Sequence, residues 1–145
     1  MKTRKQFLWF VIILGVLLFF TNCAPTKTPL PTDNIDELVG TWINPDYSIR
    51  AQKMVVEPDG IYLAYKKIED TTWTSGTGTL KLIEKWVDSK GNIWCKTRAD
   101  KPDYEVYELN KISNAGTVLE YIQDYYDYPT EIDPNHLEYR IYYRQ

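Results

Sequence analysis

The sequence predicts an all-β domain, namely a small antiparallel barrel of eight strands that follows a signal peptide and a short helical turn. From Thr41 onward, short runs rich in Val, Ile, Tyr, Trp and Thr are separated by turn residues about ten residues apart. Apolar and polar residues alternate with a period of two in several runs, which is typical of antiparallel sheet. After Gly40 no segment has the 3.6-residue apolar period of a helix.

The turn signals place the strands. In "EPDGI" Gly60 can supply the positive φ of a tight hairpin, and "DSKGNI" and "SNAGT" give the same signal. We expect strands near residues 41–44, 51–57, 61–67, 77–86, 92–98, 104–112, 117–123 and 137–144. So many short strands favour a closed barrel, with a β-sandwich as the alternative, because both limit exposed sheet edges.

The alternation also divides each strand into two faces. In the strand near 61–67, the more apolar face carries Ile61, Leu63 and Tyr65. In the last strand it carries Leu137, Tyr139, Ile141 and Tyr143. We expect these faces to point into the barrel, and the opposite faces to be wet.

The N-terminus has the layout of a secretory signal. Lys2, Arg4 and Lys5 precede an apolar run from Phe7 to Phe20, with no acidic residue before Cys23. A helix over this run would be roughly 21 Å long, short of the ~30 Å hydrocarbon core of a bilayer. A basic start and a short apolar core predict a signal peptide over residues 1–22. An uncleaved anchor in a thinned bilayer is the alternative.

The residues around Cys23 decide the kind of signal. Phe20-Thr21-Asn22 lacks the small-residue pattern of ordinary secretory cleavage. The segment resembles the lipobox of bacterial lipoproteins, in the relaxed version that spirochaetes use and that tolerates Asn before the cysteine. The resemblance implies that Cys23 is the lipid attachment site and carries palmitate-type acyl chains. It further implies a membrane protein anchored in the cell envelope, in the outer membrane rather than the inner one, because Ala24 is not the Asp that retains lipoproteins at the inner membrane.

The mature chain would then have two parts. Residues 23–32, with Pro25, Pro29 and Pro31, predict an extended tether, and residues 33–145 predict one monomeric domain. The whole chain has a net charge of −3, and loss of its basic start makes it more acidic, which argues against nucleic acid as a partner. With Cys23 acylated, Cys95 has no partner for a disulfide and is expected to be a buried, unreactive thiol.

One family resemblance bears on the fold. In "ELVGTWINPDY" a short helical turn leads into Gly40-x-Trp42 at the start of the first strand. This arrangement resembles the lipocalin pattern. The resemblance implies that Trp42 closes one end of a barrel and that an arginine of the last strand, Arg140 or Arg144, packs across its ring. These four residues would form a structural signature rather than a ligand site.

Residues for catalysis are scarce. His136, the one histidine, lies in a turn-like segment, and no nucleophile, zinc or phosphate-loop motif is present. We therefore expect no enzyme, no cofactor and no metal site. The unusual segment is residues 121–139, a long connection rich in tyrosine and carboxylates. Its candidate contact residues for a ligand or partner are Tyr121, Tyr125, Tyr126, Tyr128 and Tyr139.

Three roles for this segment remain open at this stage. Its tyrosines could simply cover the open end of the barrel, its carboxylates could hold calcium, or it could contact a partner. Two functions follow. The first is a lipid-anchored binding protein whose barrel holds a small apolar ligand. The alternative is an envelope module that engages a protein or glycan of the envelope or of a host through residues 121–139.

Overall fold

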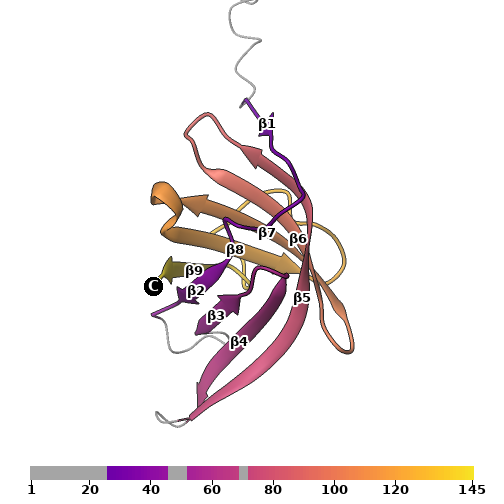
Figure 1. The fold of residues 1–145 in the computed structure, drawn as a ribbon, viewed down its shortest axis with the longest axis vertical. Helices are drawn as coiled ribbons and strands as arrows, with labels where there is room; N and C mark the ends of the chain where they lie inside the picture. The colour runs from indigo at the N-terminus through magenta and orange to yellow at the C-terminus, as the bar shows by residue number, and fades with distance from the viewer. Residues whose placement is uncertain (1–25, 46–51, 69–71) are drawn as a thin grey trace, which may run out of the picture.

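The computed structural model describes residues 26–45, 52–68 and 72–145 (Figure 1). Cys23 and the predicted signal peptide therefore lie outside the described residues. In the part of the chain that is described, no helix has the length and apolar character needed to cross a membrane. The only helical element assigned in this part is the 3-10 turn η1 at Asn114–Gly116, in agreement with an all-β domain.

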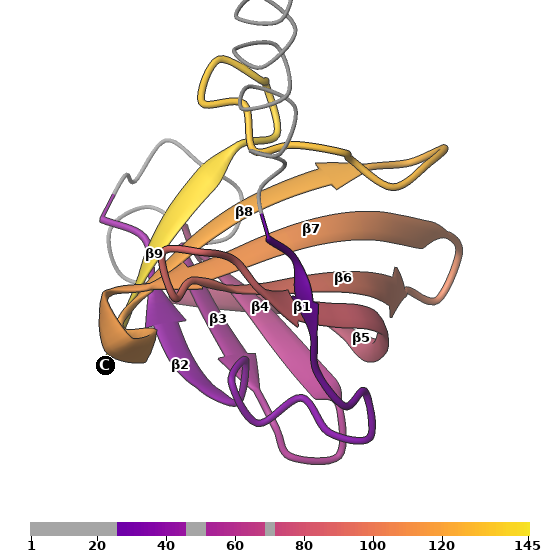
Figure 2. The ribbon, with the colours of Figure 1, turned by 90° about the horizontal axis from the view of Figure 1, so that it is seen from above.

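Strands make up most of the described chain. They are β1 (Thr28–Pro29), β2 (Gly40–Ile43), β3 (Lys53–Val56), β4 (Ile61–Ile68), β5 (Thr72–Val87), β6 (Ile93–Asp100), β7 (Glu105–Ser113), β8 (Val118–Asp124) and β9 (Arg140–Arg144). From β2 to β9 each strand is antiparallel to the next, and β9 returns to β2 by pairing Trp42 with Arg144. This pairing closes an eight-stranded barrel (Figures 1 and 2), so the predicted barrel is confirmed and the sandwich alternative is excluded.

β5 is longer than expected and pairs with two neighbouring strands along its length. Its first half pairs with β4 and its second half with β6, with a register shift between Leu82 and Glu84. β4 does not reach the end of β5, and β1 pairs with the edge that is left, where Thr28 lies opposite Val87. The Leu30 amide continues this pairing to the Lys85 carbonyl at 2.9 Å. Part of the predicted tether is thus an outer strand that shields a sheet edge.

The inward faces of β4 and β9 are the opposite of those predicted. Tyr62 is 3% exposed and points inward, whereas its neighbour Ile61 is 42% exposed. In β9, Tyr142 is buried and Tyr143 is 49% exposed. The prediction was wrong because the interior is itself partly polar. Aromatic rings with polar tips fill it, and Arg144 turns inward to reach Trp42.

The up-and-down order gives the barrel two distinct ends. The connections β3–β4, β5–β6 and β7–β8 lie at one end, together with the helical turn in which Leu38 and Val39 donate to the Ile35 carbonyl. We call this the closed end. The connections β6–β7 and β8–β9 lie at the other end, where β2 and β4 also end and β3 and β5 begin; we call this the open end.

Candidate functional site

The closed end is plugged by Trp42. Its indole is fully buried, and its Nε1 donates a hydrogen bond of 2.7 Å to the Leu38 carbonyl. The Arg144 guanidinium carbon lies 4.5 Å from the centre of the indole ring, and Nη2 of Arg144 donates to the Glu37 carbonyl. Gly40 has a φ of 134°, a value that side chains rarely allow. Among these residues Arg144, and not Arg140, is the arginine that stacks on Trp42.

The open end leads into a pocket of about 90 Å³ inside the barrel. Strands from around the barrel contribute to its walls, so the barrel itself and not one loop forms the site. The lining residues are Met54, Tyr62, Ala64, Lys101, Glu108, Tyr121, Gln123, Tyr125, Glu138, Arg140 and Tyr142. Charged and amide side chains share this lining with tyrosine rings, Met54 and Ala64, so polar and apolar surface face the pocket together.

Glu108 of β7 is the buried acid of this pocket. Its Oε2 accepts a hydrogen bond of 2.6 Å from Thr97, and its Oε1 lies 3.1 Å from the Tyr121 hydroxyl. Asn110 in turn donates to the Thr97 hydroxyl at 2.9 Å. Burial raises the pKa of Glu108, although these hydrogen bonds and the charge of Lys101 act in the opposite direction.

The hydrogens available in this network favour the protonated form of Glu108, as its burial does. The Tyr121 hydroxyl lies within hydrogen-bond distance of two acceptors, Glu108 Oε1 and Gln123 Oε1. A hydroxyl has one hydrogen to donate. If Glu108 is protonated, it donates to Tyr121, and Tyr121 donates to Gln123, so every contact has a hydrogen. A neutral Glu108 is therefore the state that satisfies the network.

Tyr62 and Lys101 form the other wall of the pocket. The buried Tyr62 hydroxyl has no hydrogen-bond partner among the residues that the structure describes. The Lys101 ammonium lies 4.5 Å from the centre of the Tyr62 ring, and burial lowers the pKa of Lys101. Within the described ranges no ion pair or hydrogen bond engages its Nζ. The pocket thus holds two strong donors that have no acceptor among the described residues.

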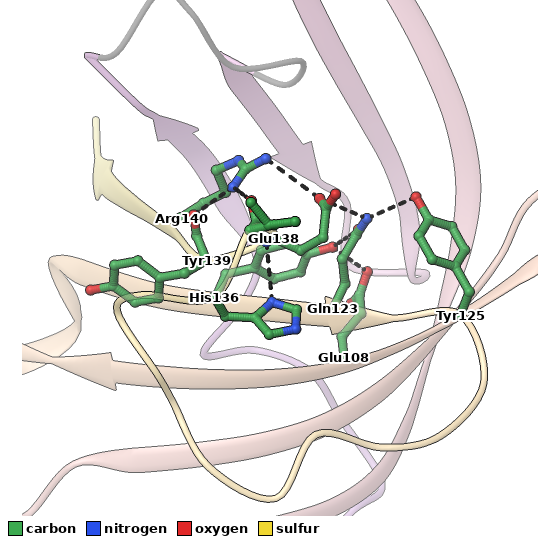
Figure 3. A network of polar contacts seen from close by, with 9 residues as sticks. Glu108, Gln123, Tyr125, His136, Glu138, Tyr139 and Arg140 are labelled. Carbon is green, nitrogen blue, oxygen red and sulfur yellow. Dashed lines mark hydrogen bonds and ion pairs between the residues drawn. The ribbon is translucent and has the colours of Figure 1, made fainter.

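A polar chain connects the pocket to its mouth (Figure 3). Gln123 Nε2 donates to the Tyr125 hydroxyl at 3.2 Å and to Glu138 Oε2 at 3.3 Å. The Arg140 guanidinium meets the same Glu138 carboxylate at 3.4 Å and donates to the Leu137 carbonyl at 2.6 Å. Arg140 therefore holds the residues before β9 in place and contributes its charge to the mouth.

The structure separates the five predicted contact tyrosines. Tyr121 and Tyr125 line the pocket. Tyr126 is 92% exposed beside the mouth, and Tyr139 donates to Glu120 at 3.3 Å on the outside of β8. Tyr128 packs edge-on against Tyr107, with ring centres 4.9 Å apart, on the outer face of β7.

The β8–β9 connection is consequently more than a lid for the open end. Leu109 of β7 and Ile122 of β8 face outward by the alternation of their strands, yet both are almost fully buried. Tyr128 and Tyr139 contact the same outer face through Tyr107 and Glu120. One half of the connection thus packs on the outside of the barrel, while Tyr125 and Glu138 reach the pocket.

Sequence reasoning missed most of the pocket, including Tyr62, Lys101, Glu108 and Gln123. The period-two alternation along β7 could have revealed Glu108. It places Glu108 on the same face as Val106, Asn110 and Ile112, and all three are buried. A carboxylate in register with apolar neighbours is a candidate for burial. His136 is exposed and lies in a turn-like segment as expected, and its Nδ1 accepts a hydrogen bond of 3.1 Å from the Glu138 amide.

The pocket offers hydrogen-bond donors, the buried carboxyl group of Glu108 and, among the described residues, one cation without an acceptor. In the part of the chain that is described, no cluster of His, Cys, Asp or Glu could hold a metal ion. Comparisons with protein-family models, with curated proteins and with solved structures found no match to this chain. The pocket must therefore be interpreted from its own geometry.

Proposed function

We propose that this protein is a bacterial lipoprotein whose lipocalin-like barrel binds a small polar molecule at the end that faces away from the membrane. The observation that carries the proposal is that Tyr62 lines the pocket and that its buried hydroxyl has no hydrogen-bond partner among the residues that the structure describes. A buried polar group without a hydrogen bond costs about 1–3 kcal/mol. A ligand that accepts this hydrogen bond would recover that cost, so the site is built to be filled.

The volume limits the size of the ligand. Sites for drug-sized molecules are roughly 300–1,000 Å³, whereas this pocket is about 90 Å³. Since each water molecule occupies about 30 Å³ of liquid, the pocket has room for a molecule of a few non-hydrogen atoms. The charged and amide side chains in its lining favour a hydrophilic ligand over the apolar one expected from the sequence.

The position of β1 supports the orientation in the membrane. β1 pairs with the last residues of β5, beside the β5–β6 connection at the closed end (Figure 1). Cys23 precedes the first described residue, Thr26, by three positions, which at ~3.5 Å each is a short distance. An acyl anchor on Cys23 would therefore hold the closed end near the bilayer and turn the pocket toward the aqueous compartment.

The anchor is tested by its chemistry. Incorporation of labelled palmitate into the full chain should be lost in Cys23→Ser and kept in Cys95→Ala. Cys95 is the matched control because burial raises the pKa of its thiol to about 12, which leaves it unreactive. Equal labelling of the Cys23→Ser variant would refute lipidation at this position.

The pocket is tested by ligand-dependent stabilisation. A library of small polar metabolites should contain compounds that raise the melting temperature of the full chain in detergent, and the shift should shrink in Tyr62→Phe. Tyr143→Phe, on the outer face of β9, is the matched control and should respond as the natural chain does. If no compound stabilises the natural chain, the binding role fails.

A second function, an envelope interaction module, is favoured by the rim of the mouth. Tyr104, Tyr126 and Leu137 are exposed there, and Leu137 is 89% exposed. The partner would be a protein or glycan. Pull-down of cross-linked partners from envelopes should lose specific species when Tyr126 and Leu137 are both replaced by Ser. Recovery of the same species by both chains would exclude the rim as the interface.

A further inference from the structure

The pocket has an excess of positive charge. Lys101 and Arg140 are its cations, and Glu138 and Glu108 are its acids. Glu138 is paired with Arg140, and the hydrogen-bond network is satisfied when Glu108 is neutral. The Lys101 charge is then left without a counterion among the described residues, and its partial burial makes such a charge costly.

We infer that the pocket binds the carboxylate group of a small organic acid, with Lys101 Nζ and the Tyr62 hydroxyl as its principal donors. This inference rests on the proposed binding function and names its ligand class. Lys101 supplies the opposite charge, and Tyr62 supplies a hydrogen bond that no described residue accepts. The contact of Lys101 with the Tyr62 ring brings the two donors to the same wall of the pocket.

The other charges in the pocket select a monoanion. A cation would meet Lys101 and Arg140, and the described residues contain no cluster that could ligate a metal. A doubly charged phosphate or sulfate would add repulsion from the Glu138 carboxylate at the mouth. A carboxylate with a short, hydroxylated or methyl substituent matches one free cation and a volume of about 90 Å³.

The tyrosines complete the recognition of the acid. Tyr121 is occupied by Glu108 and Gln123, and Tyr125 by Gln123, so these rings are fixed in position. Tyr62 differs from them because its buried hydroxyl has no hydrogen-bond partner among the described residues. Specificity for a carboxylate over a neutral amide would therefore come from Lys101, and the orientation of the bound group from Tyr62.

The test is titration calorimetry of the full chain in detergent at pH 7, with sodium acetate and sodium lactate as probes, and acetamide and sodium sulfate as comparisons. At least one carboxylate should bind saturably, and acetamide and sulfate should bind at least tenfold more weakly. Lys101→Met should weaken carboxylate binding by about 10- to 100-fold, as expected for a charged hydrogen bond, and Tyr62→Phe by about 5- to 10-fold.

Two variants provide matched controls. Lys90→Met removes an exposed lysine at the closed end, and Tyr143→Phe removes a hydroxyl on the outer face of β9, so both should bind the carboxylate as the natural chain does. Melting curves of all four variants establish that each is folded.

The possible failures of this inference and of the proposed function are distinguishable. Binding of acetamide as tight as acetate would overturn the carboxylate inference and leave the polar-ligand function in place. Normal acetate binding by a folded Lys101→Met variant would likewise overturn the carboxylate inference and leave the polar-ligand function in place. Absence of binding by both carboxylates overturns the inference, and the function itself fails only if the wider library also contains no stabilising compound.

Discussion

The two ends of the barrel use buried cations in opposite ways. At the closed end Lys85 is 4% exposed, and its Nζ contacts the side chain of Asn34 at 3.1 Å and the Glu37 carboxylate at 3.1 Å. At the open end Lys101 is also partly buried, but its Nζ meets an aromatic ring and no acceptor among the described residues.

The same contrast holds for the aromatic donors. Trp42 donates its indole hydrogen to Leu38, whereas the Tyr62 hydroxyl has no acceptor in the part of the chain that is described. Both groups are almost completely buried. The closed end therefore satisfies its polar groups internally, as a structural element does, and the open end leaves two for a ligand. Variants that remove matched groups at the two ends measure this difference directly.

The largest effect is expected from Trp42→Ala. It removes a fully buried indole, leaves a cavity, and deprives Arg144 of its stacking partner. We expect a loss of about 3–5 kcal/mol in the free energy of unfolding. Denaturation by urea, followed by circular dichroism, measures it. A loss below about 1 kcal/mol would mean that Trp42 does not close the barrel.

The next effect compares the two lysines by the same substitution. Lys85→Met leaves the Glu37 carboxylate and Asn34 without their donor, so we expect a loss of about 1–3 kcal/mol. Lys101→Met removes a charge that has no acceptor and keeps the apolar stem, so stability should be unchanged or higher. Urea denaturation of the two variants measures both values. Equal losses of stability in the two variants would contradict the inference that Lys85 has partners within the protein and that Lys101 has none among the described residues.

The fold could be predicted from the sequence because the turn residues and the alternation within each strand depend only on neighbouring positions in the chain. Turns such as the one at Gly60, with a φ of 87°, and the alternation of β6–β8 appear directly in the chain. The stacking arginine was narrowed to two residues by the family resemblance, and the register of β9 against β2 selects Arg144.

The pocket could not be predicted because it depends on which face of each strand turns inward. Period-two alternation separates two faces, but hydropathy alone placed Ile61 inward and Tyr62 outward, the reverse of the structure. The phenol ring of Tyr62 is as large an apolar body as Ile61, and only closure of the barrel shows which is enclosed. Lys101 and Glu108, which also line the pocket, were not among the predicted site residues.

A pH-dependent effect is expected at the open end. Burial raises the pKa of Glu108, so the folded state favours its protonated form. Its contribution to stability is then fully present below the unfolded pKa of about 4.3 and is lost as the pH rises through the raised folded pKa. Glu108→Gln keeps a donor to Tyr121 and an acceptor for Thr97 and does not titrate.

The Gln variant should therefore be more stable than the natural chain at neutral pH, by about 1.4 kcal/mol for each pH unit by which the pKa is raised. The difference should vanish near pH 4. Melting temperatures of the two chains from pH 4 to pH 8 measure it. Lys101, Tyr62, Tyr121 and Tyr142 also face Glu108, and they are unchanged in both chains, so their titration cancels in the comparison. Parallel curves would mean that Glu108 titrates normally.

The smallest effect is expected within the β8–β9 connection, where one side packs on the barrel and the other faces solvent. Tyr126→Ser and Leu137→Ser alter side chains that are 92% and 89% exposed, so the free energy of unfolding should stay within about 0.5 kcal/mol. Tyr128→Ser removes the ring that packs on Tyr107, and we expect it to cost about 1 kcal/mol or more.

Urea denaturation of the three single variants separates these cases. If Tyr126→Ser or Leu137→Ser costs as much as Tyr128→Ser, the rim is part of the packed structure and is not available to a partner. If only Tyr128→Ser is destabilising, the connection serves two purposes. Its outer half packs on the outside of the barrel through the contact of Tyr128 with Tyr107, and its rim presents apolar groups beside the pocket at no cost to the fold, because the stability of the barrel does not depend on them.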